Sequence, residues 1–351
     1  MRLISKSNLA VLINKLIAAG KPVIAPVQVR LENSLSKEGN DSITLYQPIK
    51  SFDDIRLDMP FPTKSAKEYF LADSEQIMTY RFGAGNKVEV QDCPESTGLI
   101  LFGVRPCEAV SYPIMDKVCT WDYNDEFYLA RRRNHTVISV SCEACDEFCF
   151  CTSVGVNPQS AEGSDILMQK TNQGNYLADF ITDKGKKLAE EYKDIFTEAG
   201  NEKPVGFKGP AKKFDLALIK PWLEKNFEHP VWDKITLPCI GCGICTFTCP
   251  NCHCFDIIDE SDLNQGARYK NWDACQFAMF TAHASGHNPR ETQAKRFRQR
   301  MEHKFNYYPD KFGRTLCVGC GRCIRHCPAD MSLLETLVMI DRLARDGSKS
   351  S

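Results

Sequence analysis

Short apolar runs alternate with amphipathic helical segments in the first part of the chain. Residues 99–102 and 137–140 are apolar runs of strand length, and residues 109–118 and 126–133 between them place apolar side chains at helical spacing. A strand, two helices and a second strand in this order are typical of a parallel β-α-β unit. The pattern therefore predicts an N-terminal α/β domain with a partly parallel sheet. Turn-forming residues at 83–86 predict a hairpin before this unit.

A break in this pattern separates the first part of the chain from the rest. Glycine, proline and polar residues dominate 200–210, and apolar residues return at helical spacing over 216–223. A chain of 351 residues also exceeds what one hydrophobic core usually organises. We predict an α+β protein in which an α/β domain over 1–205 precedes a mostly helical, ferredoxin-like domain over 213–351.

The composition narrows the class of protein. Lys and Arg number 44 against 45 Asp and Glu, which gives no charge excess of the kind that nucleic-acid binding favours. The longest apolar runs, such as 99–104, are far shorter than the roughly 18 residues of a membrane span. Lys6 and Lys15 interrupt the apolar residues of the N-terminal segment, unlike a secretory signal. We expect a cytoplasmic protein without a membrane span.

Two cysteine runs carry the strongest chemical signal. The chain has 18 cysteines, a density that in a reducing compartment indicates metal ligation. One run begins at Cys239 and the other at Cys317, and each has the ferredoxin spacing Cys-x2-Cys-x2-Cys-x3-Cys-Pro. Glycines between the cysteines let the backbone curl around a cluster; they are Gly241, Gly243, Gly319 and Gly321.

The spacing predicts two neighbouring 4Fe–4S clusters. In two-cluster ferredoxins the fourth cysteine of each run ligates the other cluster. The first cluster is therefore assigned Cys239, Cys242, Cys245 and Cys327, and the second is assigned Cys317, Cys320, Cys323 and Cys249. Zinc is the alternative, but a zinc site takes four ligands and does not need two such quartets.

The segment between the two runs is longer than in a small ferredoxin, and we expect it to be helical. Asn288 before Pro289 predicts one helix start. The segment is also rich in Lys and Arg, which we interpret as a solvated face, as compensation for negatively charged clusters, or as a surface that steers an acidic partner. The histidines near the runs have no ligand spacing and are expected to be structural.

A third group of cysteines follows the predicted parallel strands. Cys107 and Cys142 each follow an apolar run, so we expect both at the carboxyl ends of adjacent strands, where open α/β sheets bind ligands. With Cys145, Cys149 and Cys151 in the next loop, five thiols are available for four positions. Buried cysteines that pack as small apolar residues are the alternative. We predict a third 4Fe–4S cluster here.

Other cysteines have no explanation from spacing. Cys93 and Cys119 stand apart from the groups and are expected to be ordinary packing residues. Cys252, Cys254 and Cys275 stay unexplained.

Several strings together resemble one family of 4Fe–4S electron-transfer proteins, which comprises the iron–sulfur subunits of anaerobic sulfite reductases and the β-subunits of hydrogenases (sulfhydrogenases). They are residues 66–71, 102–108, 149–153, 272–275, 286–290 and 317–323, so the resemblance covers nearly the whole chain. It implies an electron relay with no catalytic residues of its own. Electrons would pass between a partner subunit with FAD and a 2Fe–2S cluster, which handles NAD(P)H, and a terminal catalytic subunit of the sulfite reductase, hydrogenase or heterodisulfide reductase type.

The resemblance also selects ligands for the third cluster. It implies Cys107, Cys142, Cys149 and Cys151, and Cys145 departs from the family pattern.

Two other functions compete with the relay. One is an iron–sulfur sensor or binding module, against which the chain shows no DNA-reading motif. The other is a catalytic N-terminal domain that binds a flavin or a small substrate near Cys107 and Cys142.

Overall fold

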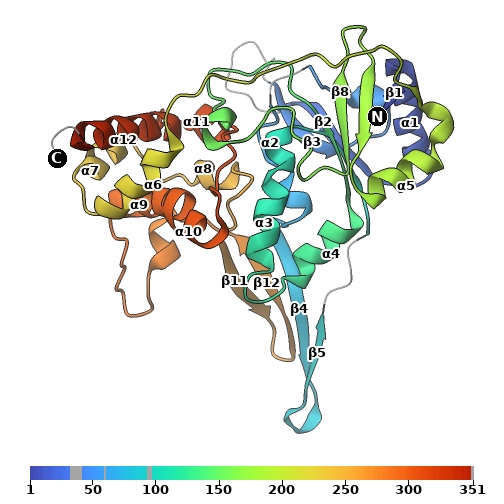
Figure 1. The fold of residues 1–351 in the computed structure, drawn as a ribbon. Helices are drawn as coiled ribbons and strands as arrows, with labels where there is room; N and C mark the ends of the chain where they lie inside the picture. Colours follow the sequence, from blue (N-terminus) through green and yellow to red (C-terminus); the bar gives the residue numbers. More distant parts are fainter. Residues whose placement is uncertain (32–41, 59–60, 93–96, 349–351) are drawn as a thin grey trace.

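A mixed sheet forms the centre of the N-terminal part (Figure 1). The computed structural model describes residues 1–31, 42–58, 61–92 and 97–348. Within them the sheet has eight strands in the order β10-β1-β9-β8-β7-β6-β2-β3. The strands are β1 (Arg2–Ile4), β2 (Val23–Arg30), β3 (Ser42–Pro48), β6 (Ile100–Val104), β7 (Thr136–Val140), β8 (Ile166–Lys170), β9 (Tyr176–Phe180) and β10 (Thr197–Glu198).

The middle of this sheet is parallel, as predicted. β2, β6, β7 and β8 pair in parallel, and the outer strands pair antiparallel. The strand β6 is buried on both faces because helices cover each of them. Ile100 and Phe102 pack with α1 (Lys6–Ala18) and α5 (Asp183–Glu191), whereas Leu101 and Val104 pack with α3 (Ser111–Cys119) and α4 (Glu126–Asn134).

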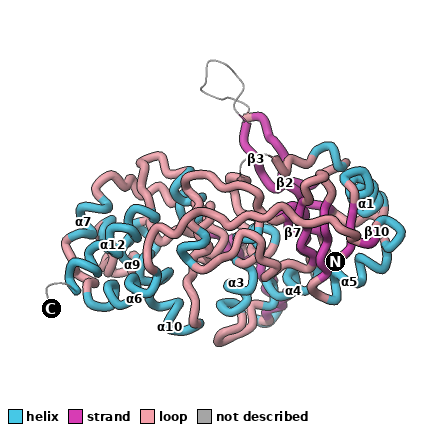
Figure 2. Tube along the Cα trace, turned by 45° about the horizontal axis from the view of Figure 1, so that its top comes forward, coloured by secondary structure: helices cyan, strands magenta, loops and turns pink. Residues whose placement is uncertain are grey.

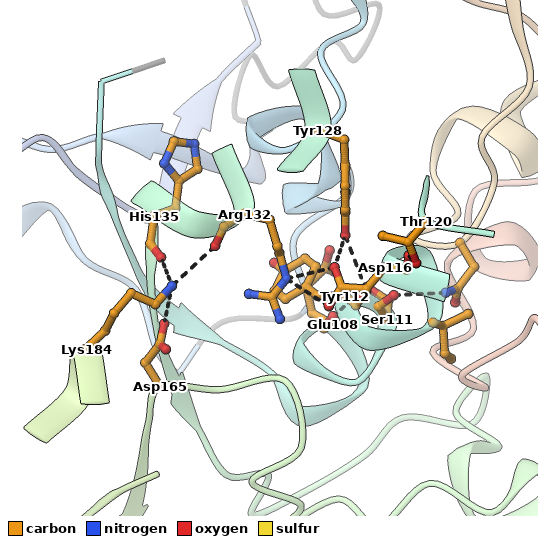
Figure 3. Close-up of polar contacts among 12 residues, drawn as sticks. Glu108, Ser111, Tyr112, Asp116, Thr120, Tyr128, Arg132, His135, Asp165 and Lys184 are labelled. Carbon is orange, nitrogen blue, oxygen red and sulfur yellow. Dashed lines mark hydrogen bonds and ion pairs between the residues drawn. The ribbon is translucent and has the colours of Figure 1, made fainter. Parts of the chain in front are cut away.

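Polar contacts tie α3, α4 and α5 together (Figure 3). On α3, Asp116 accepts hydrogen bonds from the Tyr128 hydroxyl (2.7 Å) and from Arg132 Nε (3.1 Å), both on α4. At the start of α5, Lys184 Nζ donates to the Arg132 carbonyl (3.3 Å) and pairs with Asp165 (3.4 Å). Each of these two cations therefore meets a carboxylate.

A second sheet joins segments that are far apart in sequence. It consists of β4 (Ser74–Phe82), β5 (Val88–Asp92), β11 (Phe255–Ser261) and β12 (Gln265–Trp272), all antiparallel, in the order β11-β12-β4-β5. The first part of the insertion between the cysteine runs is thus a hairpin and not the predicted helix. It is stabilised by pairing with β4, a contact that no local pattern in the insertion reveals.

Helices make up most of the regular structure after residue 213. They are α6 (Leu216–Lys225), α7 (Val231–Thr236), α8 (Ile244–Phe247), α9 (Gln293–Glu302), α10 (Tyr308–Phe312), α11 (Arg322–Arg325) and α12 (Leu333–Ser348), with a π-helical turn η7 (His303–Tyr307) between α9 and α10. The predicted helix start at Asn288 is wrong. Thr292 caps α9 instead, because its side chain accepts the Lys295 N–H.

The helical part and the sheet part lie side by side (Figures 1 and 2). An apolar cluster joins them: Val110, which precedes α3, and Ile114 of α3 pack with Phe297 and Met301 of α9 and with Leu337 of α12. The remaining short segments are α2 (Pro106–Ala109) and the 3-10 turns η1 (Phe52–Asp54), η2 (Ala66–Tyr69), η3 (Ala84–Asn86), η4 (Cys151–Val154), η5 (Lys193–Ile195) and η6 (Ala278–Thr281). No described helix combines the length and the apolar character that a bilayer crossing requires.

Candidate iron–sulfur sites

The first cysteine run closes around a cavity near the surface. Cys239, Cys242 and Cys245 line it from one side, and Cys327 of the second run lines it from the other. The cysteines predicted for the first cluster therefore lie around one space. Cys323 of the second run also reaches this cavity, so the predicted neighbouring cluster is adjacent.

The second run lies deeper in the protein. Cys317 and Cys320 are buried. Lys304 connects the fourth predicted ligand, Cys249, to this run. Its Nζ donates to Cys249 Sγ (3.4 Å) and to the carbonyl of Leu316 (2.9 Å), the residue before Cys317. The structure thus brings Cys249 beside the second run, as the crossed ligand pattern requires.

Two glycines of the second run allow a close backbone contact with the third cysteine group. Gly319 and Gly321 have positive φ angles of 64° and 74°. A Cβ atom at Gly319 would lie 2.6 Å from the backbone of Cys151, and one at Gly321 would lie 2.5 Å from the Phe148 carbonyl oxygen. The Phe150 N–H donates to the Gly319 carbonyl (2.9 Å). The two cysteine loops are therefore packed directly against each other.

The third group of cysteines also lines one cavity. Five thiols face it from the end of the parallel sheet and the following loop, and Cys320 of the second run forms part of its wall. The five are Cys107, Cys142, Cys145, Cys149 and Cys151. All but Cys145 are buried.

Two of these thiols differ in their neighbours. Burial raises the pKa of Cys149, whose thiol also hydrogen-bonds Asp146. Burial raises the pKa of Cys151 to about 11, with Cys142 and Cys145 contributing. Cys145 therefore lines the same cavity as the other four thiols, although it is more exposed than they are. Cys119 is buried away from these cavities, and Cys93 lies outside the described residues.

Three buried cations surround the cysteine runs without carboxylate partners. Arg300 Nη1 donates to Cys252 Sγ (3.3 Å), and Lys67 Nζ donates to the Cys252 carbonyl (2.7 Å). Lys304 contacts Cys249 as described above. Within the described part of the chain, none of the three forms an ion pair with an acidic side chain. Burying an unpaired charge costs several kcal/mol, so negative charge must come from the thiolates and what they bind.

The sulfur atoms favour the charged forms of Arg300 and Lys304. Burial alone would lower the pKa of Lys304, but the Cys249 and Cys252 thiols raise it above its ordinary value. Burial likewise works against the charged form of Arg300, whereas Cys245 and neighbouring thiols raise its pKa. Of the interpretations of the basic insertion, charge compensation therefore applies to Arg300 and Lys304. Other cations of the insertion form exposed ion pairs, such as Arg268 with Asp259.

A buried ion pair connects the second and third groups. Arg322, within the second run, pairs with Glu108 (2.7 Å), the residue after Cys107, and both side chains are fully buried. Arg322 Nε also donates to the Pro62 carbonyl (2.9 Å). The pair fixes the position of α11 relative to α2 and so the spacing of the two cysteine groups.

The structure also gathers cysteines that the sequence left unexplained. Cys252, Cys254 and Cys275 line a cavity of about 340 Å³ on the far side of Arg300. In the sequence only Cys252 and Cys254 lie close together. Cys275 joins them through the β11–β12 hairpin. Among the described residues, no three Cys, His, Asp or Glu side chains surround a point that a single metal ion could fill, which a zinc site would require.

Thiol-lined cavities, buried cations facing sulfur and positive-φ glycines in both runs define an iron–sulfur protein of the electron-transfer class. Comparison with known proteins agrees with this class. The family model of the 4Fe-4S dicluster domain matches residues 238–331. Sulfhydrogenase 2 subunit beta from Pyrococcus furiosus is 31% identical over 307 residues, which cover 85% of this chain and 89% of that protein. No solved structure gives a significant match.

The chain therefore belongs to the sulfhydrogenase β-subunit family, which confirms the family resemblance. It is an iron–sulfur electron-transfer subunit of a multi-subunit oxidoreductase complex of the hydrogenase type. A shorter similarity links it to the benzylsuccinate synthase activating enzyme of Thauera aromatica, at 45% identity over 62 residues, or 16% of this chain and 15% of that enzyme.

Proposed function

We propose that this chain conducts electrons through a line of three 4Fe–4S clusters. The ligands are Cys239, Cys242, Cys245 and Cys327 for the first, Cys317, Cys320, Cys323 and Cys249 for the second, and Cys107, Cys142, Cys149 and Cys151 for the third. One observation carries the proposal: Cys323 of the second group lines the first cavity, and Cys320 of the same group lines the third. The second cluster therefore lies between the first and the third.

The two ends of the line serve different partner subunits. One partner holds FAD and a 2Fe–2S cluster and handles NAD(P)H, and the other is a terminal catalytic subunit of the hydrogenase, sulfite reductase or heterodisulfide reductase type. The family relationship supports this arrangement because a sulfhydrogenase β-subunit works within a larger complex. A cytoplasmic location is part of the proposal, since so many thiols need a reducing compartment.

Iron analysis of the anaerobically purified chain tests the line. The three clusters of the line together hold about twelve irons, and Cys107→Ser is expected to remove about four of them. In the purified complex, the same variant should slow the NAD(P)H-driven reduction of the remaining clusters. Cys119→Ser is the matched control because Cys119 lines none of the cavities. Unchanged iron content in Cys107→Ser would eliminate the third cluster.

A second candidate function is supported by a cavity beside the third group. It has a volume of about 990 Å³, shares Phe61 and Cys145 with the third site, and is lined by both cationic and acidic side chains. They are Lys6, Arg56, Arg105, Lys170, Asp53, Asp58, Glu143 and Asp146. It lies at the carboxyl ends of the parallel strands, where sheets of this kind bind ligands. A flavin or small polar substrate bound there would exchange electrons with the third cluster. Flavin that co-purifies with the chain and is lost in Arg105→Met would establish this function.

A further inference from the structure

Three cysteines outside the proposed line meet at the base of the β11–β12 hairpin. Cys254 directly precedes β11, and Cys275 follows β12 by three residues. Phe255 pairs with Trp272 in the hairpin register, and the Asp273 N–H donates to the Cys254 carbonyl (2.9 Å). The antiparallel pairing therefore holds two cysteines that are twenty-one positions apart in the chain next to each other.

The sulfur atoms of this group are surrounded by donors. Cys275 Sγ accepts from Gln276 Nε2 (3.4 Å) and hydrogen-bonds the Cys254 thiol. Cys252 Sγ accepts from Arg300 Nη1 (3.3 Å). Donors of this kind stabilise thiolates, which are the form of cysteine that binds metal.

A further buried amine, Lys67, lies beside this group. Lys67 lies against the Cys252 carbonyl and over the Trp272 ring, 4.1 Å from its centre. It comes from η2, far from either cysteine run, and is buried. The thiols that act on it electrostatically are Cys252, Cys249 and Cys254, two of which belong to this group.

The cavity that these three cysteines line has room for a cofactor. Its volume of about 340 Å³ is roughly ten times the share of one water molecule in the liquid. Cys252, Cys254 and Cys275 line it together with Arg290, Gln299 and His303, and no fourth cysteine of the described chain lines it. Cys249, the nearest other thiol, belongs to the second cluster by its Cys-x3-Cys-Pro spacing.

We propose that Cys252, Cys254 and Cys275 hold a further iron–sulfur cluster with three thiolate ligands, whose remaining corner faces the cavity beside His303. This site lies outside the line of three clusters and does not depend on that line. The corner without a thiolate is open to a small exogenous ligand, as the cavity is.

Substitution of two of the three cysteines tests the site. Cys254→Ser and Cys275→Ser are each expected to lose three or four irons per chain, about the content of one cluster, whereas Cys119→Ser keeps the full content. Circular dichroism of each variant checks that the fold is retained. Wild-type iron content in both variants would overturn the proposal, and so would loss of a single iron or zinc atom.

A second measurement uses the unaltered chain, in case the variants do not fold. Mild oxidation with ferricyanide weakens the binding of the iron that lacks a thiolate ligand and releases it as ferrous iron, because only the cluster sulfides bind it strongly. Electron paramagnetic resonance should then show the signal of a three-iron cluster, and added ferrous iron with dithionite should abolish it. Absence of that signal would overturn the three-thiolate site. Neither experiment touches Cys107 or the reduction by NAD(P)H, so failure here is distinct from failure of the proposed relay.

Discussion

The helices on the sheet and the helices around the cysteine runs balance their buried charges in different ways. In the sheet region, Arg132 pairs with Asp116 and Lys184 pairs with Asp165. Around the runs, Arg300, Lys304 and Lys67 meet sulfur atoms and carbonyl groups but no carboxylate of the described chain. The polypeptide alone neutralises the first set of charges, whereas the second set depends on bound clusters.

This difference implies that the stability of the two regions depends on iron to different extents. A region whose charges are paired within the chain can fold without iron. A region whose buried cations face sulfur and carbonyl groups gains much of its stability when negatively charged clusters bind, because no carboxylate of the described chain offsets the desolvation penalty. Folding of the second region and loading of its clusters should therefore be coupled.

Removal of iron should have the largest effect. After anaerobic chelation, we expect amides of α9 and η7 to lose protection equivalent to about 5 kcal/mol or more, on the order of what structural metal sites contribute. Amides of β6 and β7 should keep most of their protection. Hydrogen exchange followed by mass spectrometry measures both regions in one sample. Equal loss in the two regions would contradict the comparison.

Breaking a carboxylate pair in the sheet region should have the next largest effect. Asp165 is almost fully buried, pairs with Lys184 and accepts the Val137 N–H (2.8 Å). Asp165→Asn leaves Lys184 without a counter-charge, and we expect a loss of about 3 kcal/mol. Denaturant unfolding under anaerobic conditions measures it, with unchanged iron content as a check on the clusters.

The control for this substitution is an exposed pair. Glu191→Gln removes the partner of Lys21 at the surface, where ion pairs contribute roughly 0–1 kcal/mol. If Asp165→Asn costs no more than Glu191→Gln, the sheet region does not depend on its internal charge pairing.

A buried histidine gives the sheet region its own pH dependence. Burial lowers the pKa of His135 to about 4, and its Nε2 lies 2.9 Å from the Tyr69 carbonyl. The unfolded chain binds a proton near the ordinary value of about 6.5, but the folded chain does not. Stability is thus fully present above pH 6.5 and falls as the pH drops toward 4, by on the order of 2 kcal/mol.

Hydrogen exchange of β7 amides at pH 7.5 and at about pH 5, corrected for intrinsic rates, measures this loss. His135→Gln keeps a donor but cannot be protonated, so its stability should change little between the two conditions. A variant with the same pH dependence as the wild type would show that another group is responsible.

Neutralising one cation beside the clusters should have the smallest effect. It should lower a reduction potential in the iron-loaded protein and raise the stability of the iron-free protein. Lys304→Met removes positive charge next to Cys249, which favours the oxidised cluster. We expect a fall in one reduction potential on the order of 60 mV, a tenfold change in a one-electron equilibrium. The iron-free protein should become more stable, because an uncompensated buried charge has been removed.

A redox titration followed by electron paramagnetic resonance measures the potential. Lys295→Met, on the preceding helix α9 and at the surface beside Glu291, is the matched control and should leave the potential unchanged. An equal shift in both variants would attribute the effect to general charge and not to the contact with Cys249.

Local patterns predicted the parts of the molecule that local interactions determine. The parallel pairing of β6 with β7 follows from apolar runs and the helices between them. The grouping of Cys327 with the first run follows from the ferredoxin spacing, because each run is a compact loop with its own glycines. The hairpin before Val88 likewise follows from the turn residues at 83–86.

Contacts between distant segments could not be predicted in this way. Cys275 joins Cys252 and Cys254 only because β11 pairs with β12, and that hairpin is in turn held by β4. Lys67 reaches the same place from yet another segment. The choice of four ligands among the five thiols of the third group depends on side-chain directions that spacing does not encode.

The pairing of β4 with β12 has a practical consequence for protein engineering. A stretch excised from 213 to 351 would carry both ferredoxin motifs but would expose one edge of β12 and lose the Lys67 ammonium. To transfer this electron-conducting part to another enzyme, residues 61–92 should therefore be included as a second segment.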